Sequence, residues 1–158
     1  MRMKGQAGSV LALVPAGFLV LIVLAALAVD SAVAYLGQRQ LHDALAAAAN
    51  DAVTAGLDNA SFYRTGKLTL DPVAVADTVC IDLAAQHDSG LQSVSVGMEL
   101  SGDSVKLSGH ASVGAVFGRA LPGFATRSVA AVASATVANS PSPIAPVAFP
   151  ASVLLRCG

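Results

Sequence analysis

The sequence predicts an α+β protein, with a long N-terminal helix, transmembrane in its first half, and a small domain of a second helix and a three-stranded antiparallel sheet. Three observations predict this class. Residues 10–29 form an uncharged apolar run, residues 30–57 continue it with helix-forming residues, and apolar and polar side chains alternate after residue 90. A chain of 158 residues has room for one modest domain beside such a helix.

The apolar run has the length of a membrane span. At about 1.5 Å per residue, a helix over residues 10–29 crosses the roughly 30 Å of a bilayer's hydrocarbon core. Its segment FLVLIVL is apolar on every face, and a chain this small has little material to bury it, which disfavours a core helix. Arg2 and Lys4 precede the run, and the first basic residue after it is Arg39. We therefore expect a single-pass protein of the cell membrane, with residues 1–9 cytoplasmic and the C-terminal domain extracytoplasmic.

A cleaved signal peptide is the alternative for this run. The basic start, the apolar run and small-x-small sites ending at Ala28 and Ala34 suit signal peptidase. Cleavage would release a secreted soluble binding domain. The run is longer than the roughly 7 to 15 residues of a signal peptide's hydrophobic region, and helix-forming residues follow it, so a retained anchor is favoured.

Residues 30–57 are expected to carry the helix out into water. One apolar stripe at three- and four-residue spacing contains Leu41, Ala44, Leu45, Ala48, Ala52 and Ala55. Gly56 and the turn-rich DNAS at residues 58–61 end the helix.

A second helix is predicted where the extracytoplasmic domain, residues 58–138, begins. Asp71 suits the N-cap, Pro72 suits the first helical position, and the helix runs to about His87. Its apolar positions include Val75, Val79, Ile81, Leu83 and Ala84.

The alternating residues predict a β-hairpin and a third strand. Val94, Val96, Met98 and Leu100 share one face of the first strand, SGD at residues 101–103 forms the turn, and the second strand covers 105–113. Residues 114–124 indicate a helical turn, and residues 127–139 the third strand. The tail, residues 139–158, has four prolines between positions 140 and 150, which favour an extended segment over a central strand or helix.

Composition and motifs argue against an enzyme. A net charge of -1 and an isoelectric point near 6.2 give no basic field for nucleic acid, and tryptophan is absent. The ten acidic residues are scattered, and His42, His87 and His110 form no metal-binding pair. No phosphate-binding or nucleophile motif occurs. We expect no catalytic residue, metal, cofactor or small-molecule substrate.

Two features are candidates for a functional role. Asp30 directly follows the apolar run, where it either marks the membrane exit or pairs with a partner's basic group inside an assembly. Cys80 and Cys157 both lie on the expected outer side, an oxidising context that permits a disulfide. Such a bridge would close a loop of about 78 residues and contribute about 4 kcal/mol in the chain-entropy model. The alternative is two unrelated thiols.

The order of these features resembles a known family. A short basic start with glycine, an apolar segment ending in Asp30, RQL at residues 39–41, the alanine-rich residues 46–55 and VAAVASATV at residues 129–137 resemble the TadE/TadG-like minor pilins and assembly proteins of the Flp (tight adherence) pilus. The resemblance covers residues 5–57 well and residues 91–138 in general pattern. It implies a bacterial structural or assembly component of a pilus or related secretion apparatus, whose N-terminal helix packs among those of other subunits.

The sequence departs from that pattern in two respects. Neither Gly5 nor Gly8 is followed by the glutamate that type IV pilin-like precursors carry five residues into the mature chain. The extracytoplasmic domain is also too short for the metal-binding von Willebrand A-like domain of the longer TadG-type members. The resemblance therefore implies a short, metal-free member.

Overall fold

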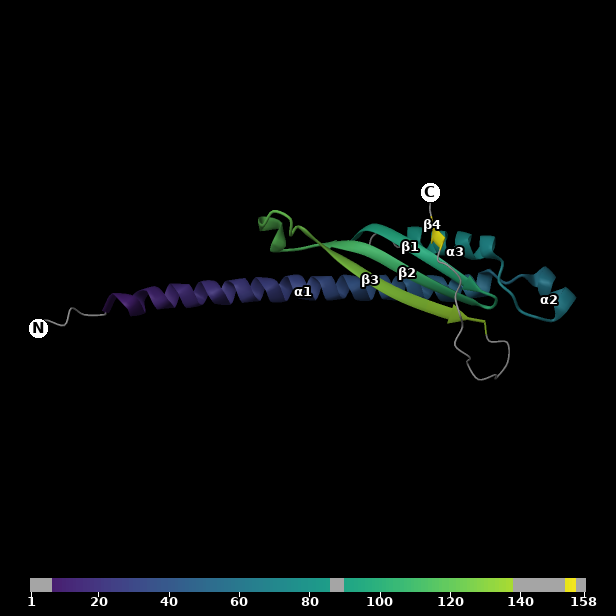
Figure 1. The fold of residues 1–158 in the computed structure, drawn as a ribbon, viewed down its shortest axis with the longest axis horizontal. Helices are drawn as coiled ribbons and strands as arrows, with labels where there is room; N and C mark the ends of the chain where they lie inside the picture. The colour runs from purple at the N-terminus through teal and green to yellow at the C-terminus, as the bar shows by residue number, and fades with distance from the viewer. Residues whose placement is uncertain (1–6, 86–89, 138–152, 156–158) are drawn as a thin grey trace, which may run out of the picture.

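The computed structural model describes residues 7–85, 90–137 and 153–155 (Figure 1). In chain order the elements are α1 (Ala7–Ala55), α2 (Asn59–Thr65), α3 (Pro72–Ala85), β1 (Leu91–Ser101), β2 (Ser104–Gly114), the 3-10 helix η1 (Gly118–Ala120), β3 (Thr126–Thr136) and β4 (Val153–Leu155). A two-layer domain includes the C-terminal half of α1, and the N-terminal half, residues 7–30, extends from it as a stalk. The predicted α+β class is confirmed.

Helix α1 runs for 49 residues without interruption. Two glycines let other elements approach it closely. A Cβ at Gly37 would lie 2.8 Å from Cγ1 of Val113, and one at Gly56 would overlap Cγ2 of Val75. Gly56 also ends the helix, as predicted, and its amide donates to the Ala52 carbonyl at 2.9 Å.

The sheet is antiparallel, with the strand order β3-β2-β1-β4. The predicted hairpin is present, and its turn contains Gly102 at a φ of 56°, a conformation that glycine adopts without strain. Strands β2 and β3 pair over their full length, from Ser104 opposite Thr136 to Gly114 opposite Thr126. The prediction of three strands is incomplete, because β4 within the proline-rich tail adds a fourth beside β1.

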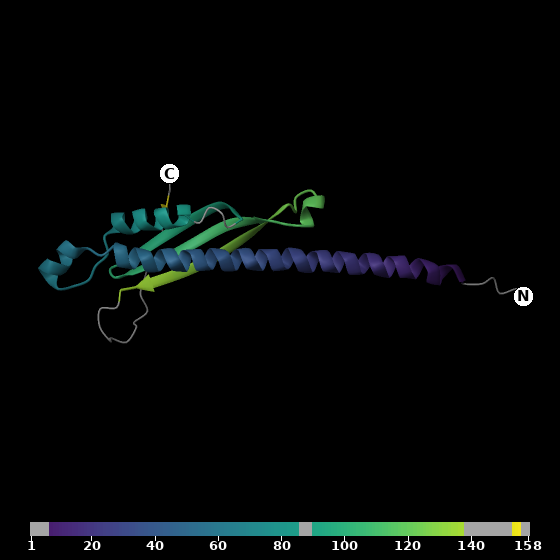
Figure 2. The same ribbon diagram turned by 180° about the vertical axis from the view of Figure 1, so that it is seen from behind.

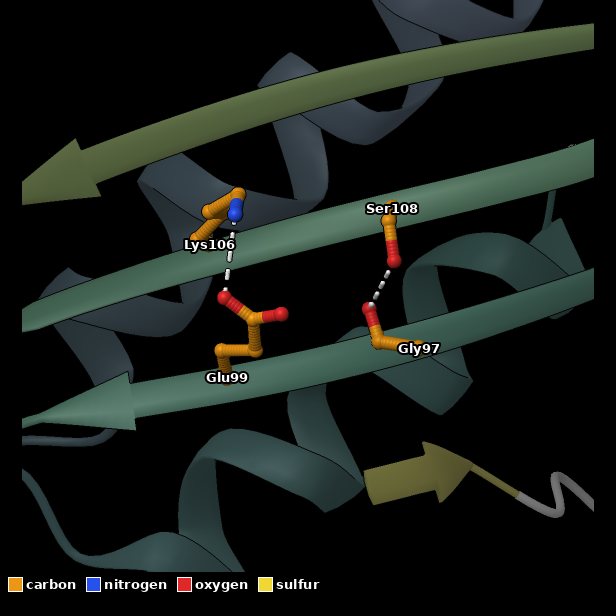
Figure 3. A network of polar contacts seen from close by, with 4 residues as sticks. All are labelled: Gly97, Glu99, Lys106 and Ser108. Atoms are coloured by element: carbon orange, nitrogen blue, oxygen red, sulfur yellow. Dashed lines mark hydrogen bonds and ion pairs between the residues drawn. The ribbon is translucent and has the colours of Figure 1, made fainter. Parts of the chain in front are cut away.

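Both long helices cover the same face of the sheet. Figure 2 shows α1 passing across the strands with α3 alongside it, and in Figure 3 both helices lie behind the strands. The core between these layers is made of aliphatic side chains, among them Leu41, Leu45, Val75, Val79, Val105, Leu107 and Val129. Gly109 of β2 leaves room for this contact, since a Cβ there would lie 2.8 Å from Cδ1 of Leu45.

The predicted stripe on α1 is buried with one exception. Leu41, Ala44, Leu45, Ala48 and Ala52 are buried, whereas Ala55 is exposed at the end of the helix. Ala49 and Val53 are buried as well. The buried surface is wider than one stripe because α1 packs against both the sheet and α3.

Three apolar positions differ from the prediction, and one of them, Ala84, is exposed near the C-terminal end of α3. Val94 is 46% exposed because a β-bulge between Gln92 and Ser95, with Ser93 at a φ of 52°, breaks the alternation of β1. Ile81 is 68% exposed, since it lies two residues beyond the buried Val79 and so on the far side of α3.

A short helix was missed between α1 and α3. The residues predicted as a turn contain the start of α2, with Asp58 as its N-cap accepting from the Ser61 amide at 2.9 Å. Gly66, at a φ of 69°, caps its C-terminus. The second predicted helix is present as α3, and the Asp71 carboxylate accepts from the Val73 amide at 2.9 Å.

The outer face of the sheet is polar along β1 and β2. Glu99 and Lys106 stand opposite each other, and their side chains form an ion pair of 3.0 Å (Figure 3). The Ser108 hydroxyl donates to the Gly97 carbonyl at 3.4 Å. Opposite charges on facing positions of adjacent strands stabilise this register.

Candidate functional site

The stalk exposes large apolar side chains along its length. Along it, large side chains such as Leu13, Phe18, Leu21 and Leu24 are between 56% and 66% exposed. One helix among the described residues, Leu13–Ala55, is long and apolar enough to cross a membrane, with a mean hydropathy of 2.5 in its most apolar window. A signal sequence near an N-terminus can also meet these criteria of length and composition.

The first charge after this surface is buried inside the protein. Asp30 is 5% exposed although it lies on the stalk, because the loop between β2 and β3 covers it. Its Oδ1 accepts hydrogen bonds from the amides of Val116 at 2.7 Å and Phe117 at 3.0 Å, and its Oδ2 accepts one from the amide of Gly118 at 2.8 Å. Both carboxylate oxygens therefore have partners within the chain.

This loop, residues 115–125, is called the β2–β3 loop below. The Ala115 amide donates to the Ala125 carbonyl at 2.9 Å and closes its base. The Phe117 backbone is in the right-handed helical region, so three consecutive amides point toward one anion. A Cβ at Gly118 would overlap the Phe124 carbonyl oxygen and lie 3.3 Å from Oδ2 of Asp30, so only glycine fits there without a shift.

The amides stabilise the ionised form of the carboxyl group. The hydrogen bond from the Phe117 amide lowers the pKa of Asp30 below its ordinary 3.8, desolvation opposes this, and the Val116 and Gly118 amides lower it further. The positive charge of Arg127 acts in the same direction. Asp30 is thus an anion that holds the loop against α1.

The predicted roles of Asp30 did not include this contact. It joins residues 86 to 88 positions apart, and no local pattern encodes such a pairing. The sequence nevertheless contained two hints of this contact. An acid beside an apolar run requires hydrogen-bond partners, and a glycine-containing turn at residues 114–124 offers free amides. Pairing with a partner's basic group stays a prediction.

An open groove of about 430 Å³ lies between α1 and the adjoining ends of β1 and β2. Its lining includes Leu36, Gln40, Val113 and Arg119, and Arg119 carries the only ionisable side chain among the residues that line it. Arginine stays protonated in proteins, so Arg119 cannot act as a general base in this groove.

The histidines and cysteines of the described part do not gather at one site. His42 donates from Nδ1 to the Val132 carbonyl at 3.1 Å, His110 is solvent-facing as expected, and His87 lies outside the described residues. Within the described ranges, no three histidine, cysteine or acidic side chains are grouped to hold a metal ion. Cys80 on α3 is disulfide-bonded. Cys157 lies outside the described residues, so the Cys80–Cys157 pairing stays a prediction.

Asp82 on α3 is the second perturbed acid. Its Oδ2 is buried without a hydrogen-bond partner. Burial raises the pKa of Asp82, and the negative charge of Asp51 on α1 raises it further. Asp82 is thus a local cost to stability.

Comparison with protein-family models, with curated proteins and with solved structures gives no match to this chain.

Proposed function

We propose that this protein is a membrane-anchored, pilin-like structural or assembly component of a Flp-type pilus or a related secretion apparatus. The observation that carries the proposal is the division of α1. Its C-terminal half is the buried helix of an α+β domain, and its N-terminal half exposes apolar side chains on all sides. This is a pilin-like architecture, and the resemblance to TadE/TadG-like proteins supports the same class.

The stalk would serve two purposes in such a system. Its apolar side chains hold the protein in the bilayer, and the same side chains pack against the helices of neighbouring subunits when an assembly forms. The outer domain would then select the neighbours. In this proposal the protein is not an enzyme, and its partners are the membrane and other subunits.

The hydrogen bonds of Asp30 argue against signal-peptide cleavage at one of the two candidate sites. Cleavage after Ala34 would remove Asp30 and leave the amides of Val116, Phe117 and Gly118 without their acceptor. Cleavage after Ala28 would retain Asp30, and its product is the secreted soluble binding domain.

Fractionation combined with intact mass tests the anchor. We expect the uncleaved chain in carbonate-washed membranes. The paired substitution Leu21→Asp with Leu24→Asp should release it, because each aspartate costs about 2.5–3.5 kcal/mol at the centre of a membrane helix. The matched control is Val73→Asp with Ile81→Asp, two equally exposed positions on α3. A soluble wild-type protein that begins at Val29 or Tyr35 would contradict the anchor.

The role in assembly must be tested in the bacterium that produces the protein. We expect that removing the protein reduces the number of surface fibres counted by electron microscopy. The wild-type chain should restore them, and the chain with Leu21→Asp and Leu24→Asp should not. Unchanged fibres and unchanged secretion after removal would contradict the assignment even where the anchor is real.

A further inference from the structure

The β2–β3 loop exposes an unusual number of large apolar side chains. Val116 is 53% exposed, Phe117 50%, Leu121 58% and Phe124 60%, although the loop is only eleven residues long. They surround η1 and point away from the core, which contains none of them. Exposed apolar side chains gathered in one place indicate a contact surface.

The position of the loop identifies what it contacts. Three hydrogen bonds of 2.7 to 3.0 Å fix it to Asp30, the residue directly after the apolar run of residues 10–29. Figure 1 shows the loop, in green between β2 and β3, reaching along α1 toward the N-terminus beyond the rest of the sheet. If α1 crosses a bilayer, the loop therefore lies at the level where that helix leaves it.

We propose that the β2–β3 loop is a second membrane contact, which inserts its apolar side chains into the interface of the outer leaflet beside α1. This inference rests on the proposed membrane anchor. Asp30 acts as the clamp that sets the depth and orientation of the loop. The protein then touches lipid at two points, the helix and the loop, instead of hanging from one.

The charges of the loop fit a lipid interface. Residues 115–125 contain no acidic side chain, and Arg119 is exposed on η1 beside the apolar residues. Arg127, at the start of β3, is exposed close by. Arginine can bind lipid phosphates while its neighbours enter the acyl region, and phenylalanine suits the boundary between them. The carboxylate of Asp30 is covered by the loop amides and does not face the phosphates.

The bilayer is favoured over a second copy as the occupant. Lipid surrounds α1 at this level in every anchored molecule, whereas a second copy would need its own complementary surface there. The apolar surface of the loop is also level with exposed apolar residues of the stalk, including Leu27 and Val29, which are 51% and 42% exposed.

Single tryptophans test the proposal, because the chain contains none of its own. Three variants of the full chain are placed in vesicles of phosphatidylcholine and phosphatidylglycerol, with bromine either shallow or deep on the acyl chains. Phe124→Trp reports on the loop, Phe18→Trp reports on the anchor, and Tyr63→Trp, on α2 at the opposite end of the domain, is the control.

We expect shallow bromine to cause about a twofold loss of emission from the tryptophan at position 124, since interfacial aromatic side chains lie at headgroup level. Deep bromine should quench the tryptophan at position 18, and neither lipid should quench that at position 63. Replacing both Phe117 and Leu121 by serine in the Phe124→Trp chain should reduce the quenching at 124 and leave that at 18 unchanged.

Each of the remaining outcomes overturns the proposed loop contact. Quenching at 18 without quenching at 124 overturns the loop contact and leaves the proposed anchor intact. No quenching at 18 overturns the anchor and the loop contact with it. Equal quenching at 63 shows general adsorption and overturns the inference. A blue shift at 124 that grows with protein concentration in detergent, without bromine quenching, assigns the surface to a second copy and also overturns it.

Discussion

Asp30 and Gly118 lie against each other although 88 positions separate them in the chain. The Gly118 amide donates to Oδ2 of Asp30 at 2.8 Å, and a Cβ at position 118 would meet that oxygen at 3.3 Å. The contact joins the stalk to the β2–β3 loop at the end of the apolar run. Most of the expected behaviour of the protein follows from this pair and from a second acid, Asp82.

Asp30→Asn should weaken the clamp. The asparagine keeps one acceptor oxygen and turns an NH2 group toward a donor, so at least one loop amide loses its partner. We expect a lower melting temperature and faster proteolysis of the loop. Asp43→Asn is the control, because Asp43 is exposed and its ion pair with Arg39 is 3.8 Å long. A loss of assembly at unchanged melting temperature would instead support pairing of Asp30 with a partner.

The substitution Gly118→Ala tests the close approach between Asp30 and the β2–β3 loop from the side of the loop. The added Cβ would overlap the Phe124 carbonyl oxygen, so the loop must shift away from Asp30. We expect a loss of about 1–3 kcal/mol in denaturant unfolding, the usual cost of overpacking. Gly17→Ala is the control, since a Cβ there meets nothing within 4 Å. Equal stability of the two variants would show that the loop adapts without cost.

The hydrogen bonds between Asp30 and the β2–β3 loop should stabilise the protein less at low pH. The loop amides hold the pKa of Asp30 below 3.8, so its contribution to stability is complete above the unfolded value and is lost as the pH falls through the folded pKa. Melting temperatures of the wild type and Asp30→Asn should therefore converge below about pH 3.8. A difference in melting temperature that persists at lower pH would mean that stabilisation by the loop amides does not depend on the charge of Asp30.

Asp82→Asn should stabilise the protein at neutral pH. Because burial raises the pKa of Asp82, its ionised form opposes folding, and this cost grows as the pH rises from 3.8 through the folded pKa. The charge also lies in the last turn of α3, where a helix disfavours an anion. We expect a higher melting temperature at pH 7 and no gain below about pH 3.8. Asp77→Asn, on the exposed side of α3, is the control.

The disulfide prediction is tested by comparing single and double substitutions. If Cys80 and Cys157 form one bridge, Cys80→Ser, Cys157→Ser and the double variant lose the same stability, about 4 kcal/mol in the chain-entropy model. Intact mass after alkylation should show no modified thiol in the wild type before reduction. Losses of stability that add in the double variant would contradict a shared bridge between Cys80 and Cys157.

The sequence predicted the elements that rest on a repeated pattern. The helix through Asp30, the hairpin around Gly102 and the buried side of β3 follow from helical or alternating periodicity over ten or more residues. Short elements were missed for lack of such a repeat. Strand β4 has three residues and is held by pairing with β1, and α2 begins within a turn-like DNAS. The bulge at Ser93, which exposes Val94, depends on one backbone angle.

The candidate site was predicted in part. Its apolar run and Asp30 were evident because they depart from ordinary composition. The β2–β3 loop was not connected to Asp30, since the hydrogen bonds form only after β2 and β3 have carried the loop alongside α1. Local sequence states which groups need partners, and the tertiary fold decides where those partners are.

The continuity of α1 has a mechanical consequence. A helix of 49 residues, about 73 Å long at helical rise, connects the stalk to the core, and its proline, Pro15, lies near the free end of the stalk. Tension on the N-terminal half therefore acts on the domain as shear between α1 and the sheet, along the helix axis. Tilting the stalk likewise turns the whole outer domain through the same angle, so neighbouring subunits that align their stalks also align the surfaces that they present outside.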